Sequence, residues 1–158
     1  MDSGVSGILA GDAHAAAGIS YRQLDHWARQ GWVTPSVDLG EGRSGRRLYS
    51  ADDVVRLDLL RHLAVSRVSP AVAGPAVGGC AVLPGDVRMV WGPVGEKDPA
   101  QTGLRVVMAG DALGVVETGG AWVVYNPAGV RRRLAAVAPD AAGASAAPLP
   151  AHAERRSA

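Results

Sequence analysis

The stretch from Gly18 to Ser50 constrains the fold of this 158-residue chain more tightly than any other part of its sequence. Between Ser20 and Gln30, a serine is followed three residues later by a glutamine, the capping-box pattern that begins a helix. Leu24 and Trp27 then recur at helical spacing as a core-facing side, so polar side chains fall on the opposite side. Gly31 ends this predicted helix.

A Gly/Arg-rich segment follows, from Val37 to Tyr49, and it predicts a two-stranded wing with arginines around its glycine-rich tip. Ser50 and Asp53 then form a second capping-box pattern, which begins a helix from Ala51 to about Ser66. The apolar residues of that helix cover more than one stripe, so we expect other elements to pack on more than one of its sides.

The flanking segments predict further short elements. The alanine-rich segment Ile8–Ala17 predicts a first helix that ends at Gly18. The segment Ser69–Gly79 contains so much proline and glycine that only a short or broken helix is expected there. Further on, short β-branched runs bounded by turn residues predict strands, and Asn126–Pro127 begins a final helix that extends to Val137.

Together these elements predict an α+β fold. The predicted strands are Val87–Trp91, Leu104–Ala109, Leu113–Glu117 and Ala121–Tyr125, with the last two joined as a hairpin at Thr118–Gly120. Residues 8–66 form the helical and winged part, residues 67–81 a linker or short helix, and residues 82–137 a small α+β unit of about four strands and one helix. The Ala/Pro-rich residues 138–158 cannot bury enough apolar surface to order themselves, so a disordered tail is expected.

The exposed side of the helix from Ser20 to Gln30 carries residue types that bind DNA. Arg can form two hydrogen bonds with guanine and Gln two with adenine, while Tyr, His and Ser can bond bases or phosphates. Alone, such a side is more often a solvated helix surface, but three arginines within five residues of the nearby loop add a cationic tip that suits a phosphate backbone. The candidate DNA contacts are Ser20, Tyr21, Arg22, Gln23, His26, Arg29, Arg43, Arg46, Arg47 and Tyr49.

A longer pattern in the same region is more specific. The sequence G-I-S-x-x-x-L-x-x-W-x-x-x-G-x-V-x-P, followed by G-R-R-L-Y-S, resembles the winged helix-turn-helix of MerR-family regulators. The segment YRQLDHWARQGWV is especially similar to actinobacterial MerR-like proteins. The resemblance covers about residues 8 to 66. It implies that the helix from Ser20 to Gln30 enters the major groove of double-stranded DNA, and that Arg47 and its neighbours contact phosphates. It also implies a homodimer and allows contact with RNA polymerase.

Two features depart from the family pattern. Asp25 stands where the family often has arginine, and because a phosphate would repel it, we expect it to turn towards Arg22 or Arg29. The long antiparallel helix through which many members dimerise is missing after residue 66. The small α+β unit could therefore be a dimerisation sheet, a small-ligand sensor or a structural cap, and dimerisation is the interpretation we favour because winged helices usually read paired half-sites.

The other polar residues predict neither catalysis nor a bound cofactor or metal. Cys80 is the single cysteine, which excludes a disulfide framework and a multi-cysteine zinc site, and we expect it to be a small buried apolar residue. Arg131, Arg132 and Arg133 are expected to form a solvated helix face. No apolar run reaches the roughly 18 residues of a membrane-spanning helix, so a soluble cytoplasmic protein is expected.

The leading hypothesis is a sequence-specific, double-stranded DNA-binding transcriptional regulator, not an enzyme. Two alternatives use the same module. An excisionase-like or architectural factor of a mobile element would bend DNA at a recombination site. A protein-interaction module would have lost DNA binding, for instance as a partner of a sigma factor or of the divisome.

Overall fold

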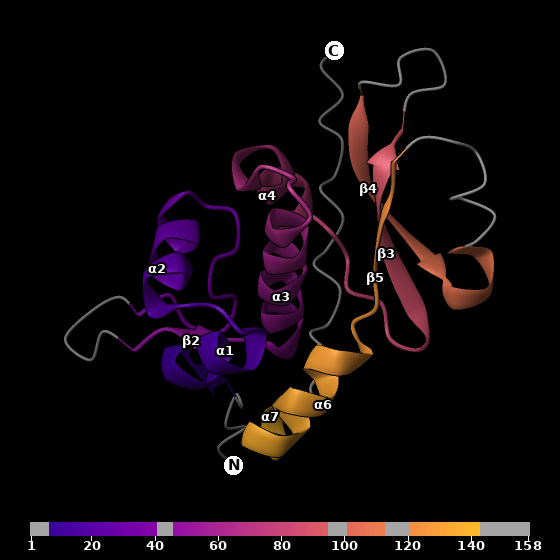
Figure 1. Cartoon of the computed structure of the whole chain (residues 1–158). Coiled ribbons are helices and arrows are strands. Elements are labelled where there is room, and N and C mark those ends of the chain that lie inside the picture. The colour runs from indigo at the N-terminus through magenta and orange to yellow at the C-terminus, as the bar shows by residue number, and fades with distance from the viewer. Residues whose placement is uncertain (1–6, 41–45, 95–100, 113–120, 143–158) are drawn as a thin grey trace, which may run out of the picture.

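The central element of the fold is α3 (Ala51–Val65), a helix that lies between the N-terminal helices and a C-terminal sheet (Figure 1). The computed structural model describes residues 7–40, 46–94, 101–112 and 121–142. The fold is α+β, as predicted. At most 1% of the surface of each of the following α3 side chains is exposed: Val54, Val55, Leu57, Leu59, Leu60 and Leu63. The prediction that this helix is covered on more than one side is therefore confirmed.

The N-terminal helices are α1 (Ala10–Ala17) and α2 (Tyr21–Arg29). Gly18 joins them in the left-handed conformation (φ 69°), which suits glycine because it has no Cβ atom. The predicted capping box of α2 is present: the Ser20 hydroxyl accepts a 3.2 Å bond from the Gln23 backbone N–H, and the Gln23 side chain accepts a 2.9 Å bond from the Ser20 N–H. Small alanines let α1 pack closely on α3.

The first strand was not predicted. We expected Ile8 and Leu9 to belong to the first helix, but they form β1 (Ile8–Leu9), which pairs antiparallel with β2 (Leu48–Tyr49). Ile8 lies opposite Tyr49, and both side chains are buried. The helix therefore begins at Ala10, because a pairing across some forty residues decides the conformation of the two residues before it.

The helix α4 (Pro70–Gly78) occupies the predicted linker. Pro70 stands at its first turn, as predicted, but Ser69 makes no side-chain capping bond. Two glycines of α4 face Trp32: a Cβ atom added at Gly74 would lie 2.4 Å from the Trp32 Cγ, and one added at Gly78 would lie 2.1 Å from the Trp32 carbonyl oxygen. These glycines therefore allow a close helix contact with the segment that follows α2.

The C-terminal sheet contains three strands within the described residues. They are β3 (Val87–Pro93), β4 (Thr102–Met108) and β5 (Val123–Tyr125), antiparallel and in the order β4-β3-β5, and the short 3-10 helix η1 (Ala109–Asp111) follows β4. Met89 pairs with Val106 on one side and with Tyr125 on the other. The predicted strand Leu113–Glu117 and the turn Thr118–Gly120 lie outside the described residues.

Two helices end the described chain: α6 (Ala128–Val137) and α7 (Pro139–Ala142). The Asn126 side chain accepts a 3.0 Å bond from the Ala128 N–H, which fits the predicted helix start. Val130 and Leu134 are buried as expected, whereas Val137 is half exposed. Residues 139–142 are helical and Ala141 is buried, so the predicted disordered tail is wrong for these four residues. Among the described helices, none combines the length and the apolar character needed to cross a bilayer.

Candidate nucleic-acid interface

The helix α2 is anchored by its apolar side and presents its polar side to solvent. Leu24 and Trp27 are almost completely buried, with 1% and 3% of their surface exposed. Tyr21, Arg22, His26 and Arg29 are exposed on the other side of the helix. Because the buried side chains fix how α2 is rotated about its axis, the exposed residues form a defined surface.

Ser20 and Gln23 differ from the other predicted contacts because they already bond each other. The Gln23 side-chain oxygen accepts from the Ser20 backbone and hydroxyl, and the Ser20 hydroxyl oxygen accepts from the Gln23 N–H. A bidentate contact from Gln23 to adenine requires both its oxygen and its nitrogen. Such a contact would have to replace these capping bonds.

Asp25 joins the polar side of α2 to the base of the predicted wing. One carboxylate oxygen forms an ion pair with Arg29, one turn further along the helix, as predicted. The other oxygen accepts a 2.9 Å bond from the Arg47 guanidinium, which was not predicted. The bond to Asp25 raises the pKa of Arg47 above its ordinary value.

The base of the predicted wing is held by backbone contacts. A β-bridge joins Asp38 to Leu48, and Gly40 lies against the backbone of Arg46 and Arg47 with a positive φ of 75°. A Cβ atom at Gly40 would lie 3.1 Å from the Arg47 nitrogen, so the close approach also favours glycine. Arg46 is exposed and Arg47 is partly buried. Arg43, at the predicted wing tip, lies outside the described residues.

Tyr49 has to be removed from the set of candidate DNA contacts. None of its surface is exposed, and its side chain packs in the core beneath β2. Burial raises the pKa of the Tyr49 hydroxyl. The sequence placed Tyr49 beside the wing arginines, but Tyr49 lies opposite Ile8 in the β1–β2 pair, and both side chains are buried.

A buried carboxylate fixes the segment between α2 and the wing. Asp53, in the first turn of α3, accepts bonds from the Ser36 N–H (2.9 Å), the Ser36 hydroxyl (2.6 Å) and the Ser50 N–H (2.9 Å). Arg56 balances its charge with a 3.1 Å ion pair. The capping box at Ser50 was predicted and is present. The contact with Ser36 was not, because seventeen residues separate the partners.

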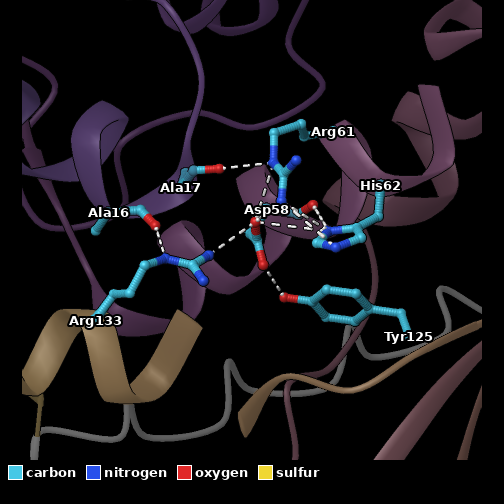
Figure 2. A network of polar contacts seen from close by, with 7 residues as sticks. All are labelled: Ala16, Ala17, Asp58, Arg61, His62, Tyr125 and Arg133. Atoms are coloured by element: carbon cyan, nitrogen blue, oxygen red, sulfur yellow. Dashed lines mark hydrogen bonds and ion pairs between the residues drawn. The ribbon is translucent and has the colours of Figure 1, made fainter. Parts of the chain in front are cut away.

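A second buried carboxylate, Asp58, joins the helix-turn-helix part to the C-terminal unit (Figure 2). It accepts a 2.7 Å bond from the Tyr125 hydroxyl of β5 and forms ion pairs with Arg61 (3.0 Å) and with Arg133 of α6 (3.1 Å). Arg133 also donates a 2.7 Å bond to the carbonyl of Ala16 in α1. Three elements, α3, β5 and α6, therefore meet at one carboxylate, and Arg133 extends the network to α1.

The predicted solvated face at Arg131–Arg133 is exposed at Arg132 and Arg133, but two of the three arginines also make long-range bonds that were not predicted. Arg133 belongs to the Asp58 network, and Arg131 donates bonds to the carbonyls of Leu83 (2.6 Å) and Gly85 (3.0 Å). Arg132 is exposed and takes no part in the contacts just described. The bonded groups lie more than forty residues away, so the arginine run alone carried no sign of them.

Cys80 is partly buried at the edge of the core, and burial raises the pKa of its thiol. Arg56 donates two bonds, of 3.0 and 2.9 Å, to the Cys80 carbonyl. Within the described part of the chain, no group of three or more His, Cys, Asp or Glu side chains is arranged to hold a metal ion.

The geometry of residues 10–73 defines a helix-turn-helix unit, with α1 and α2 joined at Gly18 and supported by α3. This same range matches the family model described as "MerR HTH family regulatory protein". The N-terminal part of the chain is therefore a MerR-type helix-turn-helix domain, and the resemblance noted in the sequence is confirmed for this part.

The chain also matches curated helix-turn-helix regulators over a short region. The chain is 43% identical over 53 residues to uncharacterised HTH-type transcriptional regulators of Mycobacterium bovis and of Mycobacterium tuberculosis strain H37Rv. The matched region is 34% of this chain and 24% of each relative. The match thus spans about a quarter of the length of these relatives.

Proposed function

We propose that the protein is a sequence-specific, double-stranded DNA-binding transcriptional regulator of the MerR type. The observation that carries this proposal is the exposed polar side of α2, which the Asp25–Arg47 ion pair joins to the base of the wing within a MerR-type helix-turn-helix domain. In the proposed complex α2 lies in the major groove, and the base of the wing lies along the phosphate backbone.

The exposed side chains divide into two kinds of contact. Arg22 and Arg29 can bond guanine edges with two hydrogen bonds, and Tyr21 and His26 can bond bases or phosphates. Arg46 is suited to contact phosphates, because a flexible cationic side chain adds affinity for the DNA backbone whatever the base sequence. The net charge of the chain is only +1, so this attraction is local to α2 and the wing.

We also propose that the protein acts as a homodimer. Helix-turn-helix dimers read two half-sites about 34 Å apart, one turn of the double helix. The C-terminal sheet is the element we expect to join the two protomers, since α4 has only nine residues and is packed on Trp32. Contact with RNA polymerase on the bound promoter would be the further step of regulation. Sedimentation of the full chain with and without DNA tests the dimer.

The DNA-binding proposal is tested with Arg22→Ala and Arg46→Ala, because both side chains are exposed and their loss leaves the core intact. The matched control is Arg132→Ala, which removes the same charge from an exposed position on α6. Each test variant should lose about tenfold or more in affinity for the bound sites, whereas the control should not. Thermal unfolding verifies that all three remain folded.

Genome-wide occupancy mapping identifies where the wild-type chain and these variants bind. Promoter sites that are lost in Arg22→Ala and Arg46→Ala support the regulator. Sites confined to recombination junctions would support an architectural factor instead. If the variants leave occupancy unchanged, the chain is recruited through another protein and the proposal is wrong.

A further inference from the structure

Asp25 is the one carboxylate that the sequence places on α2, and it lies among the cations of the proposed DNA interface. Its side chain is 23% exposed, and it binds two arginines at once. Arg29, on the same helix, is 73% exposed, and Arg47, at the base of the wing, is 31% exposed. Each arginine uses a different carboxylate oxygen, so neither displaces the other.

We infer that Asp25 is a positioning and specificity-determining residue: it holds the wing against the recognition helix and limits the affinity for DNA of any sequence. This inference rests on the DNA-binding function proposed above. Asp25 acts through Arg29 and Arg47, and the inference assigns it no contact with a base.

The positioning role follows from where Arg47 lies in the chain. Arg47 immediately precedes β2, and its backbone lies against Gly40 across the base of the wing. The bond between Asp25 and Arg47 joins α2 to the base of the wing across 22 residues of sequence. Fixing the Arg47 guanidinium therefore fixes the base of the wing relative to α2.

The effect on specificity follows from charge. Binding to the phosphate backbone releases counterions, and the logarithm of affinity falls with the logarithm of salt concentration by about 0.9 per phosphate neutralised. Asp25 offsets part of the positive charge of Arg29 and Arg47, and it repels phosphates that approach between helix and wing. Sequence-independent binding is therefore weakened. Binding to the correct site is affected less, because there base contacts compensate.

Asp25→Asn is the informative variant, because asparagine has nearly the same shape and keeps an acceptor oxygen but has no charge. It should free Arg29 and Arg47 for phosphates. The matched control is Asp111→Asn, which removes one negative charge from an exposed position on η1, beyond the C-terminal sheet. Arg47→Gln is the companion variant, since it removes the cation that Asp25 is inferred to position.

The experiment measures binding of the full chain to two duplexes over a range of salt concentrations. One duplex is the tightest sequence that the wild-type chain selects from a randomised pool, and the other is a random-sequence duplex of the same length. For Asp25→Asn we expect affinity for the random duplex to rise about fivefold, a salt dependence steeper by about one phosphate, and a loss of discrimination of similar size. NMR relaxation of the Arg47 side-chain nitrogen should show greater motion in this variant.

The outcomes separate this inference from the proposed function. If the wild-type chain selects a sequence but Asp25→Asn behaves like Asp111→Asn, the inference is wrong and the function stands. If Asp25→Asn loses affinity for both duplexes equally, Asp25 has another role and the inference is again wrong. If the wild-type chain binds neither duplex, the proposed function fails and the inference fails with it.

Discussion

The Tyr125 hydroxyl donates a 2.7 Å hydrogen bond to the Asp58 carboxylate, and the two residues are 67 positions apart in the chain. Tyr125 belongs to β5 and Asp58 to α3, so the bond joins the C-terminal sheet to the central helix of the MerR-type domain. Only 2% of the Asp58 side chain is exposed, and two arginines balance its charge. A buried carboxylate with these partners is strongly held, and the loss of any partner is costly.

Asp58→Asn should lower the free energy of unfolding by about 2 kcal/mol, because it weakens the charged hydrogen bonds that the carboxylate accepts from Tyr125, Arg61 and Arg133. Urea unfolding measures the change. The matched control is Asp86→Asn, because Asp86 forms an ion pair with Arg88 at the surface. Exposed ion pairs contribute less than about 1 kcal/mol, so the control should change little. Equal effects of the two variants would contradict the structural role of Asp58.

The same chemical change at two buried tyrosines should have opposite effects. Tyr125→Phe removes a hydrogen bond to a charged group and should lower the free energy of unfolding by about 2 kcal/mol. Among the described residues, the buried Tyr49 hydroxyl has no partner in a well-formed hydrogen bond, although the Arg47 guanidinium lies near it. Tyr49→Phe should therefore leave the free energy of unfolding unchanged or raise it by up to about 1 kcal/mol.

Tyr49→Phe also tests the corrected set of DNA contacts. Because Tyr49 is buried in the core, its replacement by phenylalanine should not change DNA affinity. Urea unfolding measures the stability of both tyrosine variants, and DNA-binding assays measure their affinity for DNA. A large loss of DNA affinity in Tyr49→Phe, at unchanged stability, would restore Tyr49 as a contact.

Stability should fall at alkaline pH partly because of these two tyrosines. Burial raises the pKa of each hydroxyl above the ordinary value of 10.0, and at Tyr125 the neighbouring Asp58 charge raises it further. The folded chain therefore retains these protons when the unfolded chain has lost them. The stabilisation is complete below about pH 10 and decreases as the pH rises beyond it. Urea unfolding at several pH values should show a shallower alkaline decrease in Tyr125→Phe than in the wild-type chain.

Two adjacent glycines at the end of α4 should differ sharply when each is replaced by alanine. A Cβ atom at Gly78 would lie 2.1 Å from the Trp32 carbonyl oxygen, so Gly78→Ala should shift the backbone and cost about 2 kcal/mol. At Gly79 an added Cβ atom would lie 3.5 Å from the Pro75 carbonyl oxygen, an ordinary contact. Gly79→Ala should thus change the melting temperature little, and similar melting temperatures for the two variants would contradict the close packing of α4.

The sequence predicted those features whose determinants lie close together in the chain. Both capping boxes, at Ser20 and at Ser50, need only residues three positions apart, and both are present. The buried side of α2 needs only helical spacing, and Leu24 is buried as predicted. The MerR resemblance added the arrangement of these elements, since a pattern of spaced residues identifies a known module.

The features that the sequence did not predict depend on partners far along the chain. Ile8 is in a strand because it pairs with Tyr49, and Arg133 is a packing residue because Asp58 and Ala16 lie beside it. From the sequence alone, the glycines of α4 indicated a linker. Glycine is needed there because the helix packs closely on Trp32, a contact that forms only in the folded chain. Composition could show that these residues were unusual for a helix, but not what they contact.

The position of α3 also decides whether the DNA-reading part can be transplanted. Its apolar surface is shared between the helix-turn-helix on one side and β5 and α6 on the other (Figure 1). A fragment cut after Gly79 would expose that second side to water and leave Asp58 without Tyr125 and Arg133. We therefore infer that the helix-turn-helix is not an independently folding unit. A fusion protein that contains it also needs the C-terminal sheet and α6.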